Sequence, residues 1–154
     1  MPEMPGVPTL PFRRRRAAHL RLGRRGERLA CTLLQRLGLD VLTTNYRTAQ
    51  GEVDIVARQG TTLCFVEVKT RHRQLHARPA DAVGRAKRQR IMQAARRYRR
   101  DLGWPAIPHR YDIVEIVLVG RRLYDVRYWP GAFTEEERPW GDTMARLDDD
   151  DLDE

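Results

Sequence analysis

Three polar side chains lie on two short apolar stretches, at a spacing that suits metal and phosphate chemistry. Asp54 lies within residues 51–57, and Glu67 and Lys69 lie within residues 63–71. Both stretches are rich in Val, Ile and Phe with an alternating character, which is typical of β-strands. Because residues two apart on a strand share a face, Glu67 and Lys69 point in the same direction.

The turn between these two strands decides which residues stand opposite each other. Gly60 suits a tight hairpin turn. A two-residue loop that begins at Gly60 places Asp54 across from Glu67. A loop one residue earlier shifts the register by two and leaves the faces unchanged, and only an odd-length loop would exchange them. The sequence therefore predicts Asp54, Glu67 and Lys69 side by side on one face of a hairpin.

This arrangement of carboxylates favours a divalent cation. Two carboxylates directly across a sheet repel each other, and carboxylates among apolar residues lose hydration. Mg²⁺ compensates for both effects, since it is typically held by one or two carboxylates with waters and substrate phosphate. Beside such a cation, Lys69 is placed to orient or activate a water, or to neutralise charge that develops on a phosphate.

The alternative is a solvent-facing side of the sheet with mixed charges. On it, Lys69 pairs with Glu67 or with Glu52, which stands across the hairpin from Lys69. An isolated Glu-x-Lys favours this alternative because the pattern is common. The placement of Asp54 on the same face favours the metal site.

The charge of the chain is divided between a basic body and an acidic end. The formal net charge is +8, yet residues 135–154 hold ten acidic and two basic residues, so residues 1–134 carry +16. A body this basic predicts a polyanionic partner, most simply nucleic acid. The alternatives are an effect on solubility or an Arg-rich genome composition.

The length of 154 residues predicts one domain with two loose ends. Residues 1–21 are expected to form a disordered Pro/Arg-rich arm, since residues 1–12 hold four prolines and no periodicity. Residues 22–134 are the predicted domain. Residues 135–154 are expected to form an acidic, disordered tail.

Cysteine usage and hydropathy indicate a cytoplasmic protein without a membrane segment. Cys31 and Cys64 each lie in an apolar run, as small buried hydrophobes do, and not in the pattern of a disulfide or metal site. No stretch approaches the length of a membrane span. The N-terminal arginines are not followed by an apolar segment, so no secretory signal is expected.

The first helix is predicted over residues 23–37, with Gly38 as its C-cap. Its apolar stripe consists of Ala30, Leu33, Leu34 and Leu37. Glu27 lies on this stripe, which is unusual for a carboxylate. Either the dipole of the first helical turn stabilises Glu27, or it is a third acidic group aimed at the metal face.

The second helix is predicted from Asp81 to about residue 102. Its inward stripe consists of Val83, Lys87, Ile91, Ala94, Ala95, Tyr98 and Leu102. Lys87 either extends along the apolar surface to solvent or reaches the acidic cluster.

The remainder of this helix carries seven arginines. A charge run is usually a solvated face, but a face of nearly one sign favours phosphate contact. The candidate nucleic-acid contacts, from this helix and from the segments around the hairpin, are Arg47, Arg71, Arg73, Lys87, Arg88, Arg90 and Arg97.

Three further strands complete the expected sheet. Residues 41–47 are predicted as an edge strand, residues 111–119 as the most apolar and central strand, and residues 123–129 as the last strand. Asp112, near the start of the apolar strand, is either structural or a more distant member of the site.

Several motifs resemble those of the YraN family of small bacterial proteins, over about residues 22–134. The matching stretches are Gly23-Arg-Arg-Gly26-Glu27, Asn45-Tyr46-Arg47, Gly51-Glu52-Val53-Asp54, Phe65-Val66-Glu67-Val68-Lys69-Thr70-Arg71, Lys87, Arg90-Ile91, Tyr111-Asp112-Ile113-Val114 and Ala132-Phe133. That family is similar to the restriction-endonuclease-like superfamily, including archaeal Holliday junction resolvases. The resemblance implies an α/β fold with an α-β-β-β-α-β core, in which a mixed sheet of four or five strands is flanked by helices.

The resemblance also implies an acidic Asp…Glu-x-Lys metal site. Carried over to this sequence, Asp54 and Glu67 hold Mg²⁺ or Mn²⁺ together with the backbone carbonyl of Val68. Lys69 orients the attacking water, and Glu27 assists the metal or the water.

The function expected from these residues is a metal-dependent endonuclease that acts on DNA with weak sequence preference. The alternative is a non-catalytic nucleic-acid-binding protein of the same fold. A junction-cleaving enzyme would be a two-fold homodimer.

Overall fold

The structure, a computed structural model, describes residues 12–73 and 83–135. Its elements in chain order are α1 (Phe12–Arg36), β1 (Asp40–Arg47), β2 (Glu52–Gln59), β3 (Thr62–His72), α2 (Arg85–Asp101), β4 (His109–Val119) and β5 (Arg122–Phe133). This order contains the expected α-β-β-β-α-β core with one strand added at its end. The predicted α/β class is confirmed.

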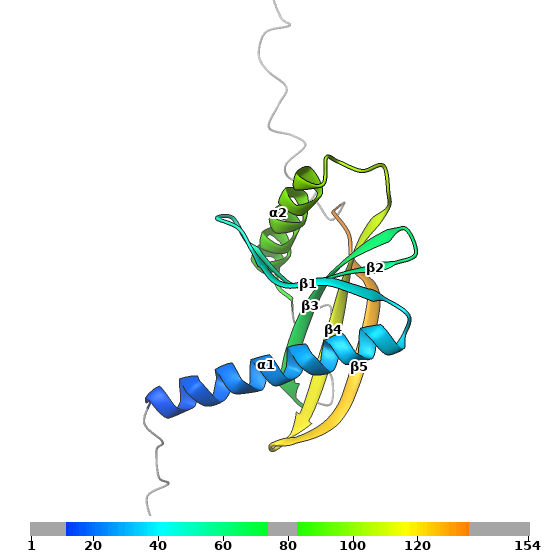
Figure 1. Ribbon diagram of the computed structural model, residues 1–154. Helices are drawn as coiled ribbons and strands as arrows, with labels where there is room; N and C mark the ends of the chain where they lie inside the picture. The colour runs from blue at the N-terminus through cyan, green and yellow to red at the C-terminus, as the bar shows by residue number, and fades with distance from the viewer. Residues whose placement is uncertain (1–11, 74–82, 136–154) are drawn as a thin grey trace, which may run out of the picture.

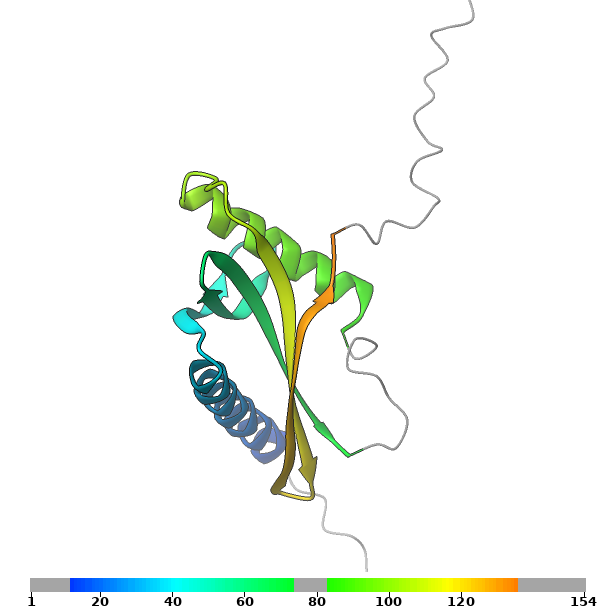
Figure 2. The same cartoon turned by 90° about the vertical axis from the view of Figure 1, so that its right-hand side faces the viewer.

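The five strands form one mixed sheet in the order β1-β2-β3-β4-β5. β3 and β4 are parallel, and every other neighbouring pair is antiparallel. A parallel pair needs a crossover connection, and α2 lies in it. Figures 1 and 2 show α2 across one end of the sheet and α1 across the other. β1 is an edge strand as predicted, whereas β4 is an interior strand and β3 occupies the centre.

The two helices cover opposite faces of the sheet. Phe65 and Ile113 belong to the apolar core that contains Ile91 of α2. Their neighbours Val66 and Val114 belong to the core that contains Ala30 and Leu34 of α1. This alternation is the period of two of a β-strand. Side chains in phase with Phe65, such as Glu67, therefore lie on the α2 face.

The β2–β3 hairpin has the predicted register. Gln59 pairs with Thr62 and Ile55 with Val66, which leaves a two-residue loop that begins at Gly60. Gly60 has a φ of 59°, a conformation that glycine adopts without a steric penalty. The next step along this ladder places Asp54 beside Glu67.

Both helices differ from their predicted limits. α1 begins at Phe12 and not at Gly23, so part of the expected disordered arm is helical. The physical reason is that residues 12–22 contain only Arg, Ala, Leu, Phe and His, with no Gly or Pro to stop a helix. Residues 1–11 and 136–154 lie outside the described residues, so the division into arm, domain and tail stays a prediction.

α2 begins at Arg85 with Gly84 as its N-cap, whereas the predicted cap, Asp81, lies outside the described residues. Leu37 and Leu102, assigned to the apolar stripes, are 48% and 51% exposed. Each follows the last residue of its helix, where the helical period no longer determines direction. No helix in the described ranges is long and apolar enough to cross a membrane.

Asp112 lies at a bulge between β4 and β5. Pairing passes from Tyr111–Phe133 to Ile113–Trp129, so β5 has two more residues than β4 across this step. A bulge of this kind leaves backbone groups without ladder partners. The fully buried Asp112 side chain lies at this gap.

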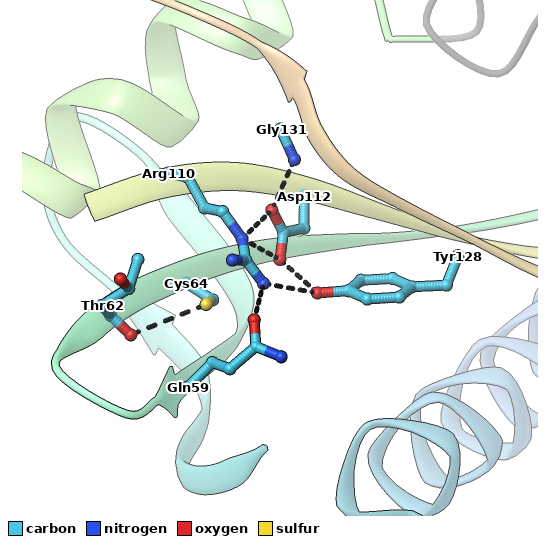
Figure 3. Close-up of polar contacts among 7 residues, drawn as sticks. All are labelled: Gln59, Thr62, Cys64, Arg110, Asp112, Tyr128 and Gly131. Carbon is cyan, nitrogen blue, oxygen red and sulfur yellow. Dashed lines mark hydrogen bonds and ion pairs between the residues drawn. The ribbon is translucent and has the colours of Figure 1, made fainter. Parts of the chain in front are cut away.

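The contacts of Asp112 show that its role is structural (Figure 3). Its carboxylate accepts hydrogen bonds from Gly131 N–H at 2.9 Å, Tyr128 Oη at 2.5 Å and Arg110 Nε at 3.0 Å. Arg110 also donates to Gln59 at 2.8 Å, which ties β4 to β2. A buried carboxylate with three hydrogen-bond donors is satisfied. Asp112 therefore holds the sheet together and is not part of the hairpin site, which consists of Asp54, Glu67 and Lys69.

Gly51 lets α2 approach the turn that leads into β2. A Cβ atom at Gly51 would lie 1.9 Å from the carbonyl oxygen of Arg90. Thr48 closes the turn itself, because its N–H donates to Gly51 O at 2.8 Å and its Oγ1 accepts from Gly51 N–H at 3.1 Å. The segment that leads to Asp54 is thus held between its own turn and α2.

Replacing Gly51 by Ala is expected to lower the free energy of unfolding by about 1–3 kcal/mol, since a clash with backbone is not relieved by side-chain rotation. Denaturant unfolding followed by circular dichroism measures the change. Gly23→Ala is the matched control, because Gly23 lies within α1 and an added Cβ meets nothing within 4 Å. That change is expected to stabilise the protein by about 0.5–1 kcal/mol. Equal effects of the two substitutions would contradict the close contact.

Candidate active site

Asp54 and Glu67 come together where the backbone ladder between β2 and β3 ends. The last paired residues are Ile55 and Val66. Beyond them, Asp54 Oδ2 accepts a hydrogen bond from the N–H of Val68 at 2.8 Å. The Asp54 side chain thus takes the place of a ladder carbonyl, and this contact fixes its carboxylate against β3.

The Glu67 carboxylate is placed in an unfavourable environment. Its side chain is 8% exposed, and its Oε2 atom has no hydrogen-bond partner in the described part of the chain. Burial, followed by the negative charge and close approach of Asp54, raises the pKa of Glu67 to about 8. The ammonium of Lys87 acts in the opposite direction but does not outweigh these effects.

Lys87 is a cation that contacts Glu67. It lies in the first turn of α2, and its Nζ atom is 3.3 Å from Glu52 Oε1 and 3.5 Å from Glu67 Oε1. Burial lowers the pKa of Lys87, but the charges of Glu67, Asp54 and Glu52 raise it more strongly. Of the two interpretations of Lys87, the structure supports the one in which it reaches the acidic cluster.

Lys69 lies on β3 two residues beyond Glu67, and it is half-buried. In the parallel register it is paired with Glu115 of β4. Among residues 12–73 and 83–135, its ammonium forms no ion pair with Glu52 or Glu67. The alternative with Lys69 as the partner of these carboxylates is therefore wrong, because Lys87 holds that position.

Glu27 is connected to the cluster only indirectly. Its Oε2 accepts a hydrogen bond from Asn45 Nδ2 at 3.1 Å. In the β1–β2 ladder, Asn45 lies opposite Asp54, between the pairs Thr44–Ile55 and Tyr46–Val53. In the described ranges no contact joins Glu27 to Asp54 or Glu67. The structure therefore brings Glu27 next to the site but not into it.

Asn45 is a site neighbour whose residue type alone did not indicate a role, although it opens the family-like stretch Asn45-Tyr46-Arg47. Its φ of 52° is in the left-handed region, where Asn is enriched among non-glycine residues. In this conformation the side chain of Asn45 donates its hydrogen bond to Glu27 of α1. The available signal was an Asn in the middle of a strand rich in β-branched residues.

Arg71 and Glu115 form a second charged pair inside the sheet. Glu115 of β4 is 1% exposed and Arg71 of β3 is 14% exposed, and the two side chains make an ion pair. Arg71 was predicted to contact nucleic acid, but this contact directs its guanidinium towards β4. The signal for Glu115 was a lone acidic residue within the apolar run of β4.

The predicted nucleic-acid contacts on α2 differ in their surroundings. Arg88 donates to the carbonyl of Val83 at 2.9 Å, and Arg97 pairs with Asp101 at 3.1 Å. Arg90 is exposed and lies one turn beyond Lys87. Arg90 is therefore the α2 arginine of this set that is best placed to contact a partner near the carboxylates.

Two further predicted contacts lie outside α2. The guanidinium of Arg47 is 3.6 Å from Glu52 and remains 74% exposed. The guanidinium of Arg73, at the end of β3, lies 4.4 Å from the ring centroid of Tyr124. Both side chains are exposed.

The donor atoms suit a cation that takes few protein ligands. In the part of the chain that the structure describes, no three His, Cys, Asp or Glu residues form a metal-binding group. The available donors are the two carboxylates, including the unpartnered Glu67 Oε2. Val68 N–H points towards Asp54, and the carbonyl of a strand residue lies on the same strand edge as its N–H. Mg²⁺ is typically held by such a small oxygen set and waters.

Glu67→Gln is expected to stabilise the protein near neutral pH. Because the pKa of Glu67 is raised from 4.5 to about 8 in the folded state, folding is increasingly opposed as pH rises through this interval. The substitution is therefore expected to raise Tm at pH 7–8 and to give no such gain at pH 4. Thermal unfolding across pH measures this difference.

Glu135→Gln provides a control of opposite sign. Burial raises the pKa of Glu135, but hydrogen bonds from Tyr111 and His109 lower it more strongly. Its removal is expected to lower Tm near neutral pH. If Glu67→Gln also lowered Tm at pH 7–8, Glu67 would be a stabilising group and the electrostatic description of the site would be wrong.

Comparison with known proteins identifies the family. The family described as "Uncharacterised protein family UPF0102" matches residues 26–116. A UPF0102 protein of Syntrophotalea carbinolica is 42% identical over 114 residues, which cover 74% of this chain and 92% of the relative. A UPF0102 protein of an Anaeromyxobacter species is 37% identical over 119 residues, covering 76% and 87%. A UPF0102 protein of Rhodococcus jostii is 40% identical over 104 residues, covering 66% and 86%.

The family match spans most of the described residues and includes every member of the hairpin site. It runs from Gly26, next to Glu27, through the β2–β3 hairpin and α2 into β4. The chain therefore belongs to the UPF0102 family, which is the YraN family that its motifs resemble.

Proposed function

We propose that the protein is a metal-dependent endonuclease that hydrolyses phosphodiester bonds in DNA. The observation that carries the proposal is the pair of carboxylates, Asp54 and Glu67, held against each other with Glu67 Oε2 buried and unpartnered. Such a pair opposes folding unless a cation occupies it, which is typical of a functional site.

The metal-binding residues of the proposal are Asp54, Glu67 and the carbonyl of Val68. When bound, Mg²⁺ or Mn²⁺ would lower the pKa of a bound water and stabilise the charge that develops on the phosphate. Asp54 is oriented for this task by the N–H of Val68. Burial of Glu67 excludes competing solvent from one side of the site.

Lys69 and Glu27 have supporting roles in the proposal. Lys69 has no carboxylate partner among the described residues, so its ammonium is available to orient water or to stabilise a developing phosphate charge. Glu27 acts through Asn45, whose side-chain amide donates a hydrogen bond to the Glu27 carboxylate. We assign Glu27 as a positioning residue for the β1–β2 side of the site.

The nucleic-acid partner is inferred from charge. Residues 1–134 carry +16, and α2 carries exposed arginines on both sides of Lys87, at Arg85 and Arg90. Phosphate contacts of this kind position a duplex or strand without reading its sequence. The proposal is therefore an endonuclease of weak sequence preference.

The direct test is cleavage of labelled single-stranded, duplex and four-way-junction DNA, and of RNA, with Mg²⁺ or Mn²⁺. Asp54→Asn and Lys69→Met are each expected to reduce the rate by about 100-fold or more. Asp125→Asn is the matched control, since Asp125 pairs with Arg127 on β5 and is expected to leave cleavage unchanged. Metal-dependent cleavage that persists in the Asp54 variant would rule out this site.

Binding is tested separately from cleavage. Arg90→Ala is expected to weaken DNA binding and to reduce the slope of log K against log salt by about 1, as loss of one phosphate contact predicts. Fluorescence anisotropy over a salt series measures both quantities. Arg127→Ala, on β5, removes the same charge away from α2 and is expected to leave the slope unchanged.

The outcomes of these two experiments separate the endonuclease from the binding protein. Salt-sensitive binding without cleavage under any metal would favour a non-catalytic nucleic-acid-binding protein. An unchanged slope for Arg90→Ala would remove α2 from the proposed interface.

A further inference from the structure

Lys87 brings a positive charge to the Asp54–Glu67 pair. Its Nζ atom lies 3.5 Å from Glu67 Oε1 and 3.3 Å from Glu52 Oε1. The side chain is 32% exposed, against 8% for Glu67 and 35% for Glu52. Lys87 thus bridges from the buried carboxylate to a carboxylate at the surface.

The backbone of Lys87 is held in place while its ammonium can move. Val83, which precedes α2, and Ile91, one turn after Lys87, are buried in the core. The contact of Gly51 with the Arg90 backbone fixes α2 further. The lysine stem has four rotatable bonds, so Nζ can move between Glu67 and Glu52 without a shift of the helix.

A divalent cation and Lys87 compete for the same carboxylate. Glu67 has one oxygen, Oε1, in contact with Lys87, and its other oxygen is buried without a partner. A divalent ion that binds Glu67 would place two cations within a few ångströms of each other, which is repulsive. Contact with Glu52, nearer the surface, offers Lys87 a position that relieves this repulsion.

We propose that Lys87 is a tethered cation that contacts Glu67 of the Asp54–Glu67 site when no metal is bound, and that an entering divalent cation displaces it from Glu67 and leaves it on Glu52 alone. This inference rests on the proposed metal-dependent function. It makes Lys87 a positioning residue that sets how tightly metal binds. It also gives Glu52 a role, as the acceptor of the displaced ammonium.

The test is Mn²⁺ affinity, measured with the full-length protein by calorimetry and by the spin-resonance signal of free Mn²⁺. Lys87→Met keeps the length and apolar stem of the side chain but removes its charge. It is expected to tighten Mn²⁺ binding by about tenfold, because a competing positive charge is gone. Arg100→Met is the matched control, since it removes one charge from an exposed residue of the same helix and is expected to leave affinity within about twofold.

Glu52→Gln tests the second half of the inference. In the wild-type background, loss of the acceptor is expected to weaken Mn²⁺ binding several-fold, because Lys87 then remains on Glu67. In the Lys87→Met background the same change is expected to have no effect. This double-mutant cycle separates two roles of Glu52. Either Glu52 acts as the acceptor for the Lys87 ammonium, or it contributes directly to metal binding.

Thermal unfolding gives a readout that does not depend on activity. Without metal, Lys87→Met leaves the carboxylate pair uncompensated and is expected to lower Tm. Saturating Mn²⁺ is expected to raise Tm more in Lys87→Met than in wild type, as tighter binding to the folded state requires.

The outcomes separate this inference from the proposed function. Mn²⁺ binding that Asp54→Asn abolishes, with no tightening in Lys87→Met, would overturn the tethered-cation inference and leave the metal site intact. A Lys87→Met protein with unchanged Mn²⁺ affinity but weaker DNA binding would make Lys87 a phosphate contact instead. No Mn²⁺ binding in either protein would overturn both the inference and the metal-dependent function.

Discussion

The register of the β2–β3 hairpin is the constraint on which the other contacts of the site depend. With Gln59 paired to Thr62, Asp54 and Glu67 stand side by side on the α2 face, and a slip of one residue would turn them towards opposite faces. The apolar side chains between them, which alternate between the two cores, hold this register. Core packing therefore forces two carboxylates together, and α2 supplies the opposing charge.

The hairpin could be predicted from the sequence because its information is local. A strand period of two and a glycine at the turn define the register without reference to the remainder of the chain. The partner of Glu67 could not be predicted in this way. Whether Lys69 or Lys87 reaches it depends on how closely α2 approaches β2, and the contact between Gly51 and the Arg90 backbone sets that distance. The contact of Asn45 could not be predicted for a similar reason, since its left-handed φ accompanies a hydrogen bond to Glu27 of α1.

The arginines show a second limit of sequence analysis. Charge counting indicated a basic surface, but it did not distinguish an arginine held by the fold from one that faces solvent. Arg71 pairs with a buried carboxylate of β4 and Arg110 with the buried Asp112, so both contribute to the sheet. Arg90 remains exposed. Sequence position alone carries no information on the partner of Arg71, because Glu115 lies on another strand, distant along the chain.

The parallel pairing of β3 with β4 has a consequence for the order of folding. A hairpin with a two-residue loop forms on the order of microseconds, whereas a parallel pair must first close a long crossover, which is slower. We therefore expect Asp54 and Glu67 to meet before α2 brings Lys87 to Glu67. Their repulsion then opposes the early hairpin until α2 brings Lys87 to Glu67.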